Sequence, residues 1–309
     1  MTFSLTILGS NSAIPTIARN PSSQILNINE RLFLIDCAEG TQIQLKKARI
    51  KSQRINNIFI SHLHGDHYYG LIGLLTSLHL FGRTKELNVY ANSELENIIN
   101  IQLEASKTKL CYPVVYHSLN YNDPEIIYED KQIIIKSFPL NHSIPTCGFL
   151  FTKKDRERGI KKEIITELNI PVSEIINIKN GEDYIDDSGK RYENSYLTKE
   201  PTPPCSYAYC SDTGYFEDII PVIKNVDTLY HEATFMEDKI QNATEKLHST
   251  AMQAATIAKK ANAGKLIIGH YSARYKDIQP VLSEAKTIFE NSYAAEDGKV
   301  FDIENRKQL

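Results

Sequence analysis

Short apolar runs, each followed by polar residues, recur along this chain. The pattern predicts strands over the following residues: 5–8, 23–28, 31–35, a run ending at His62, 131–138, 205–210, 226–230 and 266–268. The runs 23–28 and 31–35 form a predicted hairpin about Asn29 and Glu30. Because helical patterns lie between several of these strands, the chain is expected to have an α/β fold.

Helical spacing predicts three helices in the same pattern. They cover residues 42–48, a stretch beginning near Tyr69 with Leu71, Leu74, Leu75 and Leu78 on one face, and residues 249–262. The third has a face of small residues, and Gly264 is expected to end it.

Residues able to carry chemistry stand directly after five of the predicted strands. They are His62, His142, Asp212, Glu232 and His270. Loops beyond the carboxyl ends of strands are where α/β folds place their functional groups. The pattern therefore predicts that these side chains converge.

The bulk composition excludes several classes of protein. With 309 residues, 41% hydrophobic and 24% charged, the chain is typical of a soluble protein built as one large domain or two fused halves. No apolar run approaches the ~18 residues of a membrane helix. The first eight residues have no basic residue before their short apolar stretch, which indicates a strand rather than a signal peptide, so a cytoplasmic location is expected.

The cysteine count bears on whether the chain has disulfides, and the net charge bears on whether it binds nucleic acid. Five cysteines form no Cys-x-x-Cys pair, and the odd number favours buried free thiols. A net charge of −3 does not mark a nucleic-acid binder, because affinity for phosphates comes from clustered Lys and Arg. Charge must therefore be judged locally.

The composition changes between Phe151 and Glu200. Residues 153–162 hold six basic side chains against two acidic ones, followed by a predicted helix at 163–169 and a hairpin-like turn at 180–183. The segment 151–200 contains no strand-end histidine, so it is predicted to be an arm inserted into a single domain that spans residues 1–309. From charge alone it is either a binding arm or a solvated surface excursion.

The stretch from Ser61 to Leu71 carries the strongest chemical signal. In extended backbone, side chains two apart point the same way, so His62 and His64 are expected to bind one ion. Gly65 would permit a tight turn that directs Asp66 and His67 toward a second ion. Nitrogen and oxygen ligands without thiolates suit a catalytic Zn²⁺ or Mn²⁺.

Two ions need about six to eight protein ligands, and the strand ends provide seven. The predicted set is His62, His64 and His142 on one ion, Asp66, His67 and His270 on the other, and Asp212 as the bridge. A hydroxide held between the two ions would be a nucleophile at neutral pH, and the ions could clamp a phosphate oxygen. Asp66 is also assigned as the general base.

Hydrolysis of a phosphodiester also requires a proton for the departing alkoxide. His248, just before a predicted helix, is placed to supply it, and Glu232 could orient that imidazole. A surface position flanking the helix is the alternative for His248. We expect His231 to face away from the site and His79 and His117 to be structural.

These motifs resemble the ribonuclease Z family, the tRNA 3′-processing endonucleases of the metallo-β-lactamase superfamily. The resemblance is carried by Asp36 to Gln42, Ser61 to Leu71, His142, Ser211-Asp212-Thr213, His231 to Phe235, and His248 through Tyr275. It implies a metallo-β-lactamase-like αββα sandwich of two similar halves, with the protruding arm inserted in the second half. It also implies two zinc ions per subunit and a homodimer in which one subunit's arm holds the tRNA elbow.

The reaction that the resemblance implies is cleavage of precursor tRNA after the discriminator nucleotide, leaving a 3′-hydroxyl on the tRNA. The family's seven ligand positions fall on the seven residues above, its proton acceptor on Asp66 and its leaving-group histidine on His248. Phosphate contacts are expected from Arg19, Lys153, Lys154 and Arg274.

The chain departs from the family pattern at two places. A loop that often reads Pro-x-Lys-x-Arg-Asn has Ile17 in place of the lysine, and the arm's usual Gly-Pro tip is replaced by Ile170 to Glu174.

A small-molecule phosphodiesterase or arylsulfatase-like hydrolase on the same scaffold is the alternative function. The arm and His248 favour the nuclease, because a small substrate needs no distant clamp. A non-enzymatic RNA-binding protein is disfavoured, because no expected ligand is missing.

Overall fold

The structure is a computed structural model that describes residues 2–154, 158–200 and 204–303. The chain forms two compact units. Unit 1 comprises Met1–Glu129, Ile135–Phe151 and Ser206–Leu309, and unit 2 comprises Asp130–Ile134 and Thr152–Cys205. Within the described ranges, no helix is long and apolar enough to cross a membrane.

Unit 1 is built from two seven-stranded sheets. The first has the order β18-β1-β2-β3-β4-β5-β6 and the second the order β17-β16-β15-β14-β9-β8-β7. The strands of the first sheet are β1 (Phe3–Gly9), β2 (Ser23–Ile28), β3 (Arg31–Ile35), β4 (Ile55–Phe59), β5 (Leu87–Ala91), β6 (Val114–Ser118) and β18 (Val300–Asp302). Those of the second are β7 (Glu125–Glu129), β8 (Ile133–Leu140), β9 (Thr146–Lys153), β14 (Ser206–Cys210), β15 (Thr228–Glu232), β16 (Lys265–Gly269) and β17 (Ser292–Ala294).

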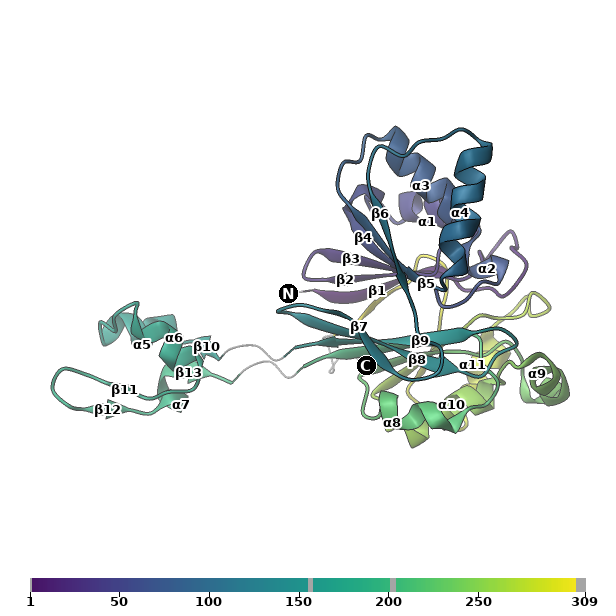
Figure 1. Cartoon of the computed structure of the whole chain (residues 1–309). Helices are drawn as coiled ribbons and strands as arrows, with labels where there is room; N and C mark the ends of the chain where they lie inside the picture. The colour runs from purple at the N-terminus through teal and green to yellow at the C-terminus, as the bar shows by residue number, and fades with distance from the viewer. Residues whose placement is uncertain (1, 155–157, 201–203, 304–309) are drawn as a thin grey trace. The chain divides into compact units, whose positions relative to one another are not determined.

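Helices cover the outer face of each sheet (Figure 1). On the first sheet they are α1 (Thr41–Lys47), α3 (Leu71–Leu80) and α4 (Glu94–Ala105), and on the second α8 (Ile220–Ile223), α10 (Ala251–Lys260) and α11 (Gln279–Lys286). The shorter helices are η1 (Ser52–Arg54), α2 (Gly65–Tyr68), η2 (Glu217–Ile219), η3 (Glu237–Lys239) and α9 (Ile240–Lys246). The predicted αββα sandwich is confirmed.

Aromatic rings fill the space between the two sheets. The ring of Phe59 on β4 lies 5.5 Å from those of both Phe149 and Phe151 on β9, measured between centroids. Phe33 on β3 lies 6.1 Å from Phe151. These side chains are buried, and burial of each contributes roughly 1.5–3 kcal/mol. The packing fixes one sheet against the other and so fixes the loops that follow their strands.

Three of the strands that precede predicted ligands, β4, β14 and β16, have parallel neighbours. Parallel pairs join β3 to β4 in the first sheet, and β14 to β15 and β15 to β16 in the second. Parallel neighbours end at the same edge, so the residues that follow them meet there. Two of these residues, Asp36 after β3 and His270 after β16, have positive φ of 53° and 59°. Such strain in non-glycine residues persists only where surrounding contacts enforce it.

The predicted hairpin about Asn29 and Glu30 and the predicted helix at 249–262 are both confirmed. Asn29 and Glu30 both have positive φ, 50° and 66°, as a two-residue type I′ hairpin requires, and the flanking strands match the predicted ranges. The predicted helix at 249–262 is α10, which begins with a capping box formed by Thr250 and Gln253.

Two predicted roles for glycine were wrong. Asn262, with φ of 52°, takes the left-handed position after α10, so the helix ends before Gly264. Gly264 is instead required for close approach, because a Cβ there would lie 2.6 Å from the carbonyl oxygen of Asp227. Gly65 does not form a tight turn with positive φ; it begins α2, and its added Cβ would meet the ring of Tyr69.

Unit 2 has a small core of its own. It contains β10 (Gly159–Ile160), α5 (Lys162–Glu167), α6 (Glu174–Lys179), β11 (Tyr184–Ile185), β12 (Arg191–Tyr192), α7 (Asn194–Leu197) and β13 (Thr198–Lys199). Ile170, Ile178 and Leu197 are buried together. The hairpin-like turn predicted at 180–183 is wrong, since those residues end α6 and the hairpin is formed by β11 and β12. Asp155, Arg156 and Glu157 of the predicted basic cluster lie outside the described residues.

Candidate metal centre

The seven predicted ligands lie together at one edge of unit 1. They form two groups whose ligand atoms lie within 4.8 Å of one another: His62, His64, His142 and Asp212 in the first, and Asp66, His67, Asp212 and His270 in the second. The predicted division of ligands between two ions therefore corresponds to two groups in space.

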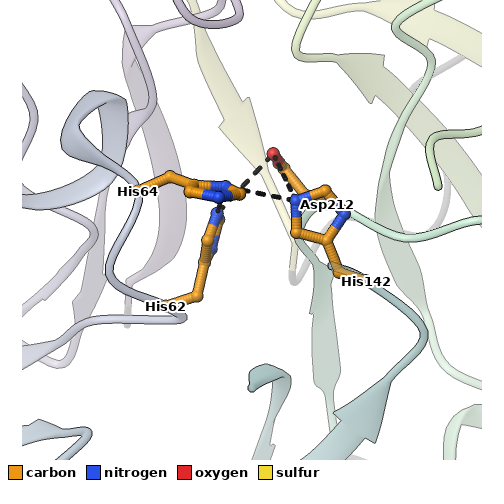
Figure 2. Close-up of side chains that lie close together, drawn as sticks. All are labelled: His62, His64, His142 and Asp212. Atoms are coloured by element: carbon orange, nitrogen blue, oxygen red, sulfur yellow. Dashed lines mark hydrogen bonds and ion pairs between the residues drawn. The ribbon is translucent and has the colours of Figure 1, made fainter. Parts of the chain in front are cut away.

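Figure 2 shows the first group, in which His62 and His64 face His142 and Asp212. His64 Nδ1 lies 3.1 Å from His62 Nε2 and 3.2 Å from His142 Nε2. Asp212 Oδ2 lies 3.7 Å from His62 Nε2 and 3.8 Å from His142 Nε2. Ligands on a tetrahedral Zn²⁺ with bonds of ~2.0–2.1 Å are roughly 3.3 Å apart, so this spacing fits a divalent cation.

The other carboxylate oxygen of Asp212 belongs to the second group. Asp212 Oδ1 lies 3.3 Å from His67 Nε2 and 3.1 Å from His270 Nε2. Asp66 Oδ2 lies 3.6 Å from His67 Nε2 and 3.5 Å from His270 Nε2. Because each oxygen of Asp212 faces a different group, the geometry is that of a bridging carboxylate.

Several ligand atoms are buried without a hydrogen-bond partner among the described residues. They are His67 Nε2, His270 Nε2 and Asp212 Oδ1, all in the second group. A buried polar atom without a partner is costly, and each of these is aimed at the same point. The orphaned atoms are what a bound cation would satisfy, so the residues fit the metal that the sequence predicts.

Charge favours the ligating form of Asp212. Burial raises its pKa, but the neighbouring imidazoles of His270 and His67 lower the pKa more, to well below its usual range. For His62, burial and the adjacent His67 lower the pKa well below its ordinary value. These are the ligating forms of the two groups. Burial lowers the pKa of His67, but the carboxylates of Asp212 and Asp66 raise it more, to well above its ordinary value, so a cation bound there would have to displace the proton of His67.

In four of the predicted imidazole ligands, the Nδ1 nitrogen has a partner that orients the ring. His67 Nδ1 lies 2.7 Å from Asp36 Oδ2, His270 Nδ1 lies 2.9 Å from Thr234 Oγ1, and His142 Nδ1 donates to the Leu247 carbonyl oxygen at 2.9 Å. His62 Nδ1 lies 3.0 Å from Ser61 Oγ. These contacts leave the four Nε2 atoms to face the centre.

Asp36 joins the two halves behind His67. It accepts hydrogen bonds from the Ser61 backbone N–H at 2.8 Å and from the hydroxyl of Tyr209, on β14, at 2.6 Å. Sequence reasoning assigned no role to Asp36 or Thr234. The signal for Asp36 was its place directly after a strand, the same position that identified the ligands.

We expect Asp36→Asn to lower metal affinity by roughly 10–100-fold, the usual weight of an outer-shell partner, because the amide cannot hold His67 as the carboxylate does. Tyr209→Phe, which removes one hydrogen bond to Asp36, should show a smaller loss in the same direction. Competition with a metal-binding dye measures both. Unchanged affinity in Asp36→Asn would show that packing alone orients His67.

His248 lies beside the metal-ligand groups and contacts Glu232. Its Nδ1 is 2.7 Å from Glu232 Oε1, and Glu232 is fully buried and also accepts from the backbone N–H of Thr213. Burial lowers the pKa of His248, but the Glu232 carboxylate raises it more, to about 9. His231 is buried apart from these groups, and His79 and His117 belong to no metal-ligand group in the described part of the chain.

A cavity of about 670 Å³ opens onto these residues. Its lining includes His64, Asp66, His142, Asp212, His248 and His270. The volume is in the range of small-molecule and substrate sites. The exposed Tyr69 and Lys246 also line it.

The predicted phosphate-binding residues occupy different surroundings. Arg19 is largely buried and donates to Asn11 Oδ1 at 2.9 Å and to the Tyr275 carbonyl oxygen at 2.6 Å. Arg274 is exposed, with its guanidinium 5.0 Å from the ring centre of Phe235. Lys153 is buried at the end of β9 in unit 2, and Lys154 follows it.

Comparisons with known proteins cover the whole chain. A family model described as anti-Pycsar protein Apyc1 matches residues 3–154. Ribonuclease Z of Phocaeicola vulgatus is 45% identical over 305 residues, which cover 99% of both chains. The solved structure of the human short-form tRNase Z is 26% identical, with a TM-score of 0.71 over 97% of this chain and 99% of that one.

A second solved structure, the metallo-β-lactamase fold protein YhfI from Bacillus subtilis, shares the fold. Its TM-score is 0.68 at 19% identity, covering 98% of this chain and 100% of that one. The match to the curated relative extends over both halves of unit 1 and over unit 2, at an identity far above that of a shared fold alone. The chain therefore belongs to the ribonuclease Z family.

Proposed function

We propose that this chain is a divalent-metal-dependent endoribonuclease that removes the 3′ trailer from precursor tRNA. The observation that carries the proposal is the pair of metal-ligand groups sharing Asp212, with His248 lining the same cavity and the buried Glu232 in contact with His248. Family membership supplies the substrate, since the relatives are named ribonuclease Z and tRNase Z. Two Zn²⁺ ions are our proposal for the metals, because the ligands are imidazole nitrogens and carboxylate oxygens.

Bound at these two places, divalent cations supply Lewis acidity that lowers the pKa of water and polarises a phosphoryl oxygen. The chain's own residues then perform the proton transfers. We assign Asp66 to accept the proton of the attacking water, as its carboxylate borders the cavity. The bond to the 3′-oxygen breaks as that oxygen takes a proton from His248, so the tRNA retains a 3′-hydroxyl and the trailer takes the phosphate.

Glu232 is proposed to hold His248 in place for this proton transfer. Its second oxygen, Oε2, accepts hydrogen bonds from the hydroxyl of Thr234 at 2.7 Å and from the Thr234 backbone N–H at 3.0 Å. A carboxylate fixed on both oxygens keeps one orientation, and its charge stabilises the protonated imidazole.

The test is incubation of the purified protein with a trailer-bearing precursor tRNA, with and without a chelator, and mapping of the cut at nucleotide resolution. We expect one metal-dependent cut after the discriminator nucleotide. Hydrolysis of a small chromogenic diester without any cut in the tRNA would instead favour the small-molecule hydrolase.

Unit 2 is proposed to be an arm that contacts tRNA. Its exposed Lys162 and Lys190 provide positive charge, whereas the exposed Arg191 pairs with Asp183. The backbone N–H of Lys153 donates to the Cys205 carbonyl oxygen at 2.9 Å, so the two ends of the inserted segment are adjacent. A short loop can therefore replace the residues between them.

Replacing residues 155–203 by a short Gly-Ser loop is expected to raise the KM for precursor tRNA at least ~10-fold, because phosphate contacts are lost. Hydrolysis of a small diester, which has no tRNA phosphates for the arm to contact, serves as the control. An equal loss on both substrates would show that the segment supports the fold instead.

We further propose that the protein acts as a homodimer, as the family resemblance implies. Ile43 on α1 and Leu80 on α3 are apolar side chains with exposed fractions of 60% and 80%, which a subunit contact would cover. Light scattering on the purified protein tests the proposal, and the mass of a single chain at micromolar concentration would contradict it.

A further inference from the structure

Unit 1 carries a basic groove away from the metal centre. The groove has a volume of about 620 Å³ and lies between η1 with the end of α1 on one side and the loop after α3 on the other. Lys46, Lys51 and Lys85 line it, and all three are exposed. We call it the basic groove.

Positive charge is concentrated here although the whole chain has a net charge of −3. Residues 40–54 contain five basic side chains and no acidic one. Of these, Arg54 pairs with Glu30 at 3.1 Å. No ion pair in the described part of the chain involves the exposed cations Lys46, Lys47, Arg49, Lys51 and Lys85. Like charges gathered without counter-charges are what a polyanion would neutralise.

The wall of the basic groove is fixed by Arg83. Its buried guanidinium donates to the carbonyl oxygens of Lys85 at 2.7 Å, Glu86 at 2.7 Å and Gln53 at 3.2 Å. These hydrogen bonds join the loop after α3 to the segment before β4. Lys51 and Lys85 therefore project from backbone that is already ordered, which lowers the entropy cost of binding.

An aromatic side chain completes the groove. Phe81, at the end of α3, lines it with 61% of its surface exposed. Exposed aromatic rings beside lysines are the usual means by which proteins stack on unpaired bases while binding phosphates. Lysines that can neutralise phosphates together with a ring that can stack on a base fit an RNA strand.

The groove lies at the opposite end of β4 from the metal ligands. It includes Ser52 and Gln53, just before β4 begins at Ile55, whereas His62 follows the end of β4 at Phe59. Five residues of strand span ~16 Å. An RNA bound in the groove thus contacts the protein several nucleotides from the bond at the metal centre.

We propose that the basic groove of Lys46, Lys51 and Lys85 binds the sugar-phosphate backbone of the RNA substrate at a position remote from the scissile bond. The inference rests on the proposed function for the identity of the RNA. It adds to unit 1 a contact surface distinct from the metal centre and from unit 2.

The test compares two triple variants of the metal-loaded protein. Lys46→Gln, Lys51→Gln and Lys85→Gln are combined in the groove variant. The control variant carries Lys109→Gln, Lys224→Gln and Lys286→Gln, which are exposed lysines of unit 1 outside the groove, so both lose the same charge. The Kd for a processed tRNA is measured by filter binding over a range of salt concentrations.

We expect the slope of log Kd against log salt concentration to fall by ~2–3 in the groove variant and to change little in the control variant. The reason is that each lost phosphate contact removes about one from this slope. The KM for precursor tRNA should rise at least ~10-fold while kcat stays within about twofold. A third protein with arginine at the three groove positions should bind as the wild type does.

Equal slopes in the groove and control variants would overturn the inference while leaving the proposed function intact. A change of oligomeric mass in the groove variant would overturn it too, by showing that this surface joins subunits. Failure of the wild type to cut precursor tRNA while it still binds processed tRNA through the groove would refute the proposed function alone.

Discussion

Asp66→Ala is expected to abolish cleavage of precursor tRNA while the fold survives. The substitution removes the proposed proton acceptor and one ligand of the second group. Its effect should therefore exceed the ~10²–10⁴-fold loss typical of acid–base assistance alone. Single-turnover cleavage measures the loss, and thermal unfolding in the presence of chelator measures the fold without the contribution of metal.

The control for this variant is Asp218→Ala, which removes an exposed carboxylate of η2 in the same unit. Its activity should match that of the wild type. We also expect Asp66→Ala to bind less metal, because Asp66 Oδ2 lies 3.5–3.6 Å from two imidazole nitrogens of the second group. Full metal content together with retained cleavage would remove Asp66 from the mechanism.

His248→Ala is expected to lower kcat for precursor tRNA by ~10²–10⁴ and to leave the metal content unchanged. The reason is that His248 contacts Glu232 and belongs to neither group of proposed metal ligands that shares Asp212. The departing 3′-oxygen is a poor leaving group without a proton, so the loss falls on the chemical step.

Comparison of two substrates with different leaving groups shows whether His248 is a proton donor or a structural residue. p-Nitrophenolate leaves readily without protonation, so His248→Ala should affect the hydrolysis of a p-nitrophenyl phosphodiester far less than that of RNA. Equal losses on both substrates, or loss of metal, would indicate that His248 supports the site instead. His117→Ala, which alters a ring stacked on Tyr90 away from the ligand groups, is the matched histidine control.

The strands, and the residues that form the two groups sharing Asp212, were predictable from sequence because their signals are local. A run of apolar residues followed at once by His or Asp identifies both the strand and the residue that it positions, as β14 and Asp212 show. The hairpin at Asn29 and Glu30 was predictable for the same reason, since a two-residue turn needs its own pair of residues.

Contacts between distant segments were not predictable in this way. Tyr209 and Asp36 are 173 residues apart, and only the packing of one sheet on the other brings the hydroxyl to the carboxylate. Gly65 and Gly264 were misread because glycine permits both positive φ and close approach, and sequence alone does not distinguish the two uses. The basic groove was not predicted because Lys85 is far from residues 46–51 in the sequence and lies beside them only in the folded protein.

The order of the ligands along the chain has a consequence for how the protein is made. His62, His64, Asp66 and His67 are synthesised early, whereas the shared Asp212 and then His270 come much later. A partly translated polypeptide still attached to the ribosome thus lacks the residue common to both groups. Both groups can therefore be completed only after the second half of the chain has been synthesised and has folded against the first.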